Sequence, residues 1–395
     1  MPSDLPTLTL YSSPGGPRPR ATRIVRIIAL VRGVGCFLAA WGTAGAAPDE
    51  APGRDAAGGP PALRPAAPYT LPAVDGDLLA LDDEMRRFFS ARIDLTASQD
   101  TRVNQVVTAL LGEQGLHLVY AADANFSARE VFHQRHGNCL SFSLLAVAVA
   151  RASGLTAKFC EVNSYSRWDR FGKLITEIRH VNVQIWANLD RYELDLLPIA
   201  ERVAPIASAR VVSDARAFAH FYNNLGVFRL SEGAAAEAQV LFDRALAADS
   251  TAAFVWANKG SALQMAGDQA AARNCLERAV REDPADLAAL SSLADFYGRT
   301  GEPGLATKLN KKVERYRLRN PYYLSLLARN EYGRGAFREA EAHLRRAIAI
   351  KDDEPEFYEL RILVAQGLGR AADAQRWENK LKALQTPPKT APHGP

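Results

Sequence analysis

The chain has 395 residues, 48% hydrophobic residues and a net charge of +4, which together allow two or three folded domains. Five arginines and one acidic residue lie within the first 47 residues, so the rest of the chain is close to neutral. Because nucleic-acid binding requires a basic surface, the charge distribution argues against a nucleic-acid-binding protein.

Residues 1–46 have the three parts of a secretory signal peptide. Arginines precede the apolar run Gly33–Trp41, and small residues lead to a cleavage position after Ala46. The apolar run is too short to span a bilayer, so we expect an exported, periplasmic protein without a permanent membrane anchor. Residues 47–69 are rich in Ala, Gly and Pro and are expected to form a flexible linker.

A folded module is expected over residues 70–215, and it opens with two amphipathic stretches. These stretches, about Asp77–Arg92 and Ser98–Leu116, carry apolar residues at helical spacing and are predicted to be helices. Residues 156–163 are predicted to form a strand. The polar residues Ser164–Glu177 are expected to form a loop whose aromatic residues either wall a substrate groove or anchor the loop.

The stretch His136–Leu155 predicts a buried helix with a cysteine in its first turn. An uninterrupted apolar run follows Cys139 and ends at Gly154, which suits a helix C-terminus. The positive end of a helix favours a thiolate, so this position lowers the pKa of a cysteine. The alternative is that Cys139 is a small core residue, because free cysteines are often buried.

Two predicted strands follow, and each carries a polar residue suited to thiol chemistry. Residues 181, 183 and 185 are apolar and alternate with polar ones, which predicts a half-buried strand with His180 on the other face. A turn near 188–190 precedes a second alternating strand that contains Asp195. A hairpin with an even-length turn would place His180 and Asp195 on one face. A nucleophile, a base and an orienting carboxylate are what thiol acyl transfer requires.

Three motifs, G-N-C-L-S-F-S, H-V-N-V and Y-E-L-D-L-L-P, together resemble the transglutaminase-like superfamily of papain-fold cysteine enzymes over about Leu71–Val212. Their spacings, 180 − 139 = 41 and 195 − 180 = 15, are typical of bacterial members. The resemblance implies an α+β, papain-like fold in which Cys139 attacks an amide, His180 transfers the proton and Asp195 orients the histidine. One departure is that two leucines separate Asp195 from Pro198, which leaves the local turn open.

The resemblance also bears on the oxyanion site and on the reaction. Papain-like folds often use an upstream glutamine, which suggests Gln134, five positions before Cys139, as a donor beside the Cys139 backbone N–H. The residues leave open whether water or an amine resolves the acyl-enzyme, and the resemblance favours hydrolysis, as in a peptidase. No metal-binding or nucleotide-binding motif is present, so neither a metal nor a cofactor is expected.

Removal of the signal peptide would leave three cysteines, at positions 139, 160 and 275. The sequence leaves open whether Cys139 and Cys160 form a disulfide in an oxidising compartment.

The C-terminal half of the chain repeats with a period of 34 residues. Five glycines recur at that spacing, each followed five residues later by an alanine: Gly233, Gly267, Gly301, Gly335, Gly369 and Ala238, Ala272, Ala306, Ala340, Ala374. This pattern predicts an all-α solenoid of five tetratricopeptide repeats over residues 219–384, which binds a protein or peptide on its concave face. Residues 385–395 are expected to be disordered.

The sequence is compatible with two functions. In the first, the cysteine domain is an amide hydrolase or acyl transferase, and the repeats recruit a protein partner or substrate. In the second, the domain is catalytically inactive and the chain is a protein-binding adaptor.

Overall fold

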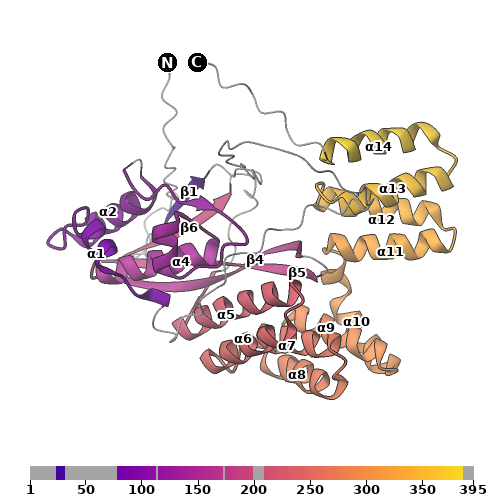
Figure 1. Cartoon of the computed structure of the whole chain (residues 1–395), viewed down its shortest axis with the longest axis horizontal. Coiled ribbons are helices and arrows are strands. Elements are labelled where there is room, and N and C mark those ends of the chain that lie inside the picture. Colours follow the sequence, from indigo (N-terminus) through magenta and orange to yellow (C-terminus); the bar gives the residue numbers. More distant parts are fainter. Residues whose placement is uncertain (1–23, 32–77, 113, 172–173, 199–208, 386–395) are drawn as a thin grey trace, which may run out of the picture. The chain divides into compact units, whose positions relative to one another are not determined.

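The computed structural model describes residues 24–31, 78–112, 114–171, 174–198 and 209–385 (Figure 1). The chain divides into two compact units. The first extends to Cys160 and also includes Val181–Pro205, whereas the second comprises Glu161–His180 and the residues from Ile206 onward. The predicted cleavage position after Ala46, the linker 47–69 and residues 386–395 lie outside the described residues. The domain limits set by the sequence therefore stay predictions.

Helices and short strands come first along the chain, followed by a group of longer strands. The elements up to residue 212 are β1 (Ile24–Val31), α1 (Asp83–Ser90), α2 (Gln99–Leu111), β2 (Val119–Tyr120), α3 (Ala128–Gln134), β3 (His136–Gly137), α4 (Cys139–Ala152), β4 (Thr156–Phe171), β5 (Leu174–Ala187), β6 (Asp190–Pro198) and β7 (Ala209–Val212). The predicted helices are confirmed as α1, α2 and α4. Both α1 and α2 are shorter than predicted: the side chain of Asp82 caps α1, which therefore begins at Asp83, and α2 ends at Leu111, before its C-cap Gly112.

The longer strands form a five-stranded sheet in the order β1-β6-β5-β4-β7, and β2 pairs with β3. Strand β1, which lies inside the predicted signal peptide, pairs parallel with β6. Strands β5 and β6 are antiparallel, with Gln184 opposite Glu193, and a two-residue turn joins them. Asn188 in this turn has a φ of 51°, a left-handed conformation that suits a tight hairpin. The even-length turn expected from the sequence is therefore confirmed.

The loop predicted at Ser164–Glu177 is wrong. Strand β4 continues to Phe171 and β5 begins at Leu174, so most of this segment is strand. We call the parts of β4 and β5 that belong to the second unit, Glu161–Phe171 and Leu174–His180, the arm. The arm lacks the apolar alternation that predicts a strand. Its charged side chains instead pair with helices far along the chain, as Arg170 and Arg179 do.

Apart from the arm and β7, the described part of the second unit consists of ten helices that pack as five consecutive pairs (Figure 1). They are α5 (Asp214–Ser231), α6 (Ala235–Ala248), α7 (Ala253–Met265), α8 (Gln269–Glu282), α9 (Leu287–Arg299), α10 (Pro303–Arg317), α11 (Pro321–Gly333), α12 (Phe337–Ile350), α13 (Pro355–Gly367) and α14 (Ala371–Gln385). The five periodic glycines lie between the helices of each pair at φ of 71° to 90°, where a side chain would be strained. The periodic alanines are buried. The 34-residue period therefore marks five helix pairs.

We predict that Gly260→Ala destabilises the repeat unit. A Cβ at Gly260 would lie 2.7 Å from Cγ of Leu276 on the paired helix, and overpacking of this kind costs about 1–3 kcal/mol. The matched control is Gly298→Ala, where nothing lies within 4 Å of the new Cβ. This control should keep or slightly raise the thermal midpoint, because alanine favours helix over glycine. Equal midpoints for the two variants would contradict the packing described.

Candidate active site

The N-terminus of α4 is held by a set of buried side-chain contacts. Oδ1 of Asn138 accepts the backbone N–H of Ser141 at 2.9 Å, which caps the helix. The Asn138 backbone N–H donates to the Ala124 carbonyl at 2.9 Å, and its side-chain amide donates to Oδ1 of Asn125 at 3.3 Å. Cys139 is therefore the first residue of a firmly capped helix, with 8% of its surface exposed.

Two buried serines extend these contacts from the first turn of α4. Oγ of Ser141 accepts the N–H of Phe126 at 2.7 Å and donates to the carbonyl of Ala124 at 3.0 Å. Oγ of Ser143 lies 2.8 Å from the Cys139 carbonyl oxygen and 3.3 Å from that of Val181 on β5. The Ser143 hydroxyl thus connects the helix turn of Cys139 to the strand residue that follows His180.

The paired, antiparallel strands β5 and β6 carry a row of buried polar side chains. The pairing of Gln184 with Glu193, continued by the alternation along each strand, places this row on one face. Its members are His180, Asn182, Gln184, Glu193 and Asp195, each at most 6% exposed. Nδ2 of Asn182 donates to Oε1 of Glu193 at 2.7 Å. By this alternation His180 and Asp195 fall on the same strand face, and their roles stay a prediction.

The sequence wrongly predicted β5 to be half-buried. Residues 180–185 are buried on both faces, and the Asn182 amide nitrogen finds a buried partner in Glu193, whereas the side-chain oxygens of Asn182 and Gln184 are buried without one among the described residues. The sequence placed Gln184 and Glu193 on the polar faces of their strands but did not predict that they are buried. Their polar character at alternate positions was visible, but the same pattern is typical of a solvent-exposed face.

Gln134, the suggested oxyanion donor, is the last residue of α3 and is exposed. Its backbone carbonyl lies 2.8 Å from Nδ1 of His136, and Arg135 beyond it adopts a left-handed φ of 59°. An exposed side-chain amide is hydrogen-bonded to water, which it must give up before it can donate to an oxyanion. It therefore stabilises an oxyanion less than a donor in a water-excluded site does. The role of Gln134 stays a prediction.

Cys139, Cys160 and Cys275 are all free and buried, so Cys139 and Cys160 form no disulfide in this structure. Burial raises the pKa of the Cys160 thiol to about 12, and the nearby Glu193 carboxylate raises it further. Burial also raises the pKa of Cys275. Both thiols therefore ionise less readily than an ordinary cysteine does.

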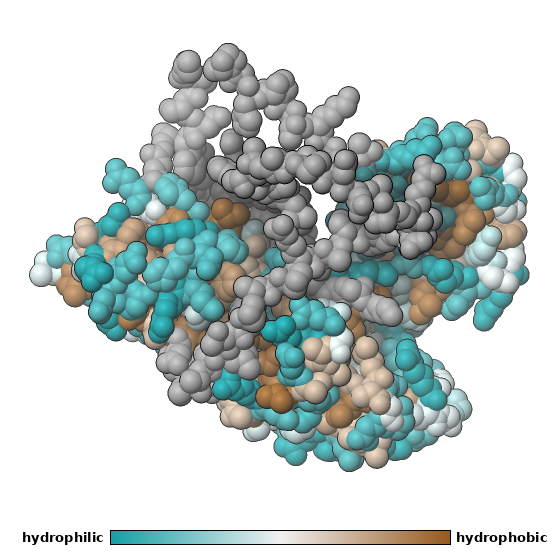
Figure 2. Space-filling model, viewed as in Figure 1, coloured by the Kyte–Doolittle hydropathy of each residue, from teal (hydrophilic) through white to brown (hydrophobic). Residues whose placement is uncertain are grey.

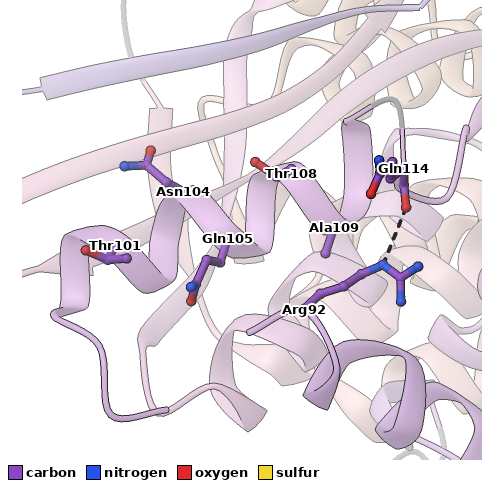
Figure 3. A pocket seen from close by; sticks show the side chains of 7 residues that line it. All are labelled: Arg92, Thr101, Asn104, Gln105, Thr108, Ala109 and Gln114. Carbon is purple, nitrogen blue, oxygen red and sulfur yellow. Dashed lines mark hydrogen bonds between the residues drawn. The ribbon is translucent and has the colours of Figure 1, made fainter. Parts of the chain in front are cut away.

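A pocket of about 270 Å³ lies beside α2 and away from these residues (Figure 3). It is lined by Arg92, Thr101, Asn104, Gln105, Thr108, Ala109 and Gln114, and Arg92 reaches the Gln114 carbonyl across it. The surface over α1 and α2 is mainly hydrophilic (Figure 2). None of Cys139, His180 and Asp195 lines this pocket, so it is not the candidate active site.

The described residues contain neither a metal-binding cluster nor a helix that could span a membrane. Within the parts of the chain that the structure describes, no group of three His, Cys, Asp or Glu side chains is arranged to hold a metal ion. None of the described helices is long and apolar enough to cross a bilayer.

Comparison with known families bears on residues 92–193, which include most of the helices and strands before the repeats. Residues 92–193 match the family model of the Transglutaminase-like superfamily. The chain carries a transglutaminase-like domain. The match includes Cys139 and His180 and ends two residues before Asp195. A search of curated proteins found no match.

The repeat half is similar to solved helical-repeat proteins. MamA 41-end from Desulfovibrio magneticus RS-1 is 16% identical, with a TM-score of 0.31, over 42% of this chain and 94% of that one. MamA AMB-1 is 21% identical, with a TM-score of 0.29, over 42% and 91%. YrrB, described as a TPR protein with an unusual peptide-binding site, is 16% identical, with a TM-score of 0.28, over 42% and 86%. The 34-residue period and the helix pairs carry the tetratricopeptide assignment of this half.

We predict that Ser141→Ala destabilises the transglutaminase-like domain. The substitution leaves the N–H of Phe126 and the carbonyl of Ala124 without their hydroxyl partner, and such a buried loss costs about 1–3 kcal/mol per group. Ser90→Ala is the control, because its hydroxyl is exposed and bonds only to the Arg87 carbonyl. Urea unfolding should show a lower midpoint for Ser141→Ala alone. Matching midpoints would show that the Ser141 contacts are not needed.

We also predict that protein carrying Cys36→Ser and Cys139→Ala labels slowly with iodoacetamide, Cys36 being replaced because it lies in the predicted signal peptide. Alkylation requires a thiolate, and the raised pKa values of Cys160 and Cys275 keep both thiols protonated as the pH rises through the ordinary cysteine value of about 8.5. Mass spectrometry of the folded variant should show little adduct at that pH, and rapid labelling after unfolding in urea. Fast labelling of folded Cys160 would contradict the burial described.

Proposed function

We propose that the transglutaminase-like domain is a thiol-dependent amide hydrolase or acyl transferase. Cys139 is the nucleophile, His180 the base and Asp195 the residue that orients the imidazole. The observation that carries the proposal is the position of Cys139 as the first residue of a capped, buried helix. The shared strand face of His180 and Asp195 supports it.

The proposed reaction proceeds in two steps. The Cys139 sulfur attacks the carbonyl carbon of a peptide or glutamine side-chain amide, and His180 takes the thiol proton. The C–N bond then breaks, the proton passes to the leaving amine, and a thioester remains on Cys139. Water attacks the thioester in the hydrolytic reaction, or an amine attacks it in the transfer reaction, and the thiol is regenerated. We favour hydrolysis over transfer, because bacterial members of the transglutaminase-like superfamily, which this chain resembles, are commonly regarded as peptidases.

The developing oxyanion needs hydrogen-bond donors. We assign the first to the backbone N–H of Cys139, which lies at the positive end of α4. Gln134 remains the proposed second donor, although its side chain is exposed and would have to turn toward the substrate.

The repeats are proposed to recruit a protein partner or substrate. Their first helices contact one another along the chain at α5–α7, α7–α9 and α11–α13, which forms a layer suited to an extended ligand. We also keep export as a proposal, because the N-terminal arginines precede Gly33–Trp41. Cleavage after Ala46 would remove β1 and leave β6 as an edge strand of the mature sheet.

We predict that Cys139 is the fastest-labelling thiol of the folded protein. A thiolate stabilised by the helix end and by His180 should alkylate at least about ten times faster than an ordinary cysteine at pH 6. Iodoacetamide rates across pH, read by peptide mapping, should show a low apparent pKa that rises toward about 8.5 in His180→Ala.

Cys160 and Cys275 are internal controls in the same experiment, because burial raises the pKa of both. If Cys139 labels no faster than they do, the catalytic proposal fails. The chain is then better explained as a protein-binding adaptor.

A further inference from the structure

The arm carries arginines whose partners are acidic residues of the repeats. Arg179 donates from one nitrogen to both carboxylate oxygens of Asp286, the residue that caps α9, at 2.9 and 2.8 Å. Arg170 pairs with Glu356 on α13, and its guanidinium lies 5.0 Å from the ring centroid of Tyr322. An arginine guanidinium can pair with a carboxylate and also stack on an aromatic ring. These contacts therefore favour a strand that carries cationic side chains.

A second contact fixes the base of the arm on the first repeat. Oε1 of Glu161 lies 2.8 Å from Nε2 of His220 and 3.0 Å from Nε of Arg216, both on α5. The His220 ring stacks on Phe254 of α7 at 4.1 Å. The arm therefore contacts three first helices of their pairs, at α5, the cap of α9, and α13, and its Glu177 also accepts a hydrogen bond from Tyr316 of the second helix α10.

Trp168 lies between two hydrophobic clusters of the repeats. On one side it packs against Leu290, Val313 and Tyr316, with 5.4 Å between the Trp168 and Tyr316 ring centroids. On the other side it packs against the cluster that contains Tyr322. Most consecutive helix pairs pack through the second helix of one pair and the first of the next, as at α6–α7, α8–α9 and α12–α13. At α10–α11 this packing is weak, and Trp168 fills the junction.

The fit of Trp168 is incomplete. Its indole N–H is buried and has no hydrogen-bond partner in the structure. An unsatisfied buried donor costs about 1–3 kcal/mol, so the arm binds its own repeats less tightly than a fully satisfied segment would. A segment that offers the same charges without this loss can compete with the arm.

We propose that this face of the repeats is a docking surface for an extended protein segment that presents an aromatic side chain and arginines. In the isolated chain the arm occupies the surface as a substitute ligand, and a partner segment of the same chemistry binds by displacing it. Complementarity to Asp286 and Glu356, together with the aromatic site at the α10–α11 junction, selects the partner. The inference rests on the proposed recruiting role of the repeats and specifies its ligand.

Competition within one chain has a measurable consequence. A tethered segment acts at an effective concentration in the millimolar range, so the arm should exclude a free peptide until the contacts of the arm are weakened. The probe is a fluorescein-labelled synthetic peptide with the sequence of Glu161–His180, and its binding to the full chain is read by fluorescence anisotropy.

We predict that Trp168→Ala protein binds this probe at least about ten times more tightly than the unaltered chain, because its own arm competes less. Arg170→Ala, at a partly exposed position, should act in the same direction and serves as a second weakened arm. Adding Asp286→Asn to Trp168→Ala should abolish the gain. Asparagine still caps α9, so this change removes the charge that Arg179 requires and keeps the helix.

Arg345→Ala, at an exposed position on α12, is the matched control and should leave probe binding unchanged.

Equal probe affinity for the unaltered chain and both weakened arms would overturn the proposal, as would binding that is indifferent to Asp286→Asn. Dimers formed by exchange of arms, detected by size-exclusion chromatography, would also overturn it, because the occupant would then be a second copy of the chain. Thiol labelling of Cys139 is a separate readout. Failure of the catalytic proposal and failure of this one are therefore distinguishable.

Discussion

The transglutaminase-like domain depends on the burial of α4. Residues Cys139–Ala150 are all buried, and a helix that is apolar on every side must be covered on every side. Helices α2 and α3 and strand β6 pack against it. The polar groups of its first turn are satisfied internally by Asn138, Ser141 and Ser143. Because neither the helix nor its cap can shift without exposing apolar surface or losing hydrogen bonds, the position of Cys139 is fixed by the fold.

The strands depend on a second constraint, which is the cost of burying polar groups. Residues 180–185 are buried on both faces, so the polar row on β5 and β6 must find hydrogen bonds within the protein or bear the cost of a lost partner, as the buried side-chain oxygens of Asn182 and Gln184 do. The bond between Asn182 and Glu193 is one such contact. Up to His180 the same strand β5 belongs to the repeat unit, where Arg179 pairs with Asp286. One strand therefore carries both the proposed base and a contact that holds the arm on the repeats.

Features encoded locally were predictable from the sequence, and features that depend on distant partners were not. The apolar run after Cys139 predicted α4, strand alternation predicted the shared face of His180 and Asp195, and the 34-residue period predicted the helix pairs. The arm was missed because its partners, such as Asp286 and Glu356, lie more than a hundred residues away along the chain. The burial of Gln184 and Glu193 was missed because a polar strand face usually contacts solvent.

The central claim is that the thiol at the start of α4 is ionised at neutral pH. The most direct test is the ultraviolet absorbance of the thiolate, titrated with pH in the folded chain and in Cys139→Ser protein. We expect the unaltered chain to lose the absorbance of one thiolate as the pH falls through a midpoint well below the ordinary cysteine value of about 8.5. Cys139→Ser protein should show no such loss. Identical titrations of the two proteins would contradict the account, because Cys139 would then be a neutral thiol of the core.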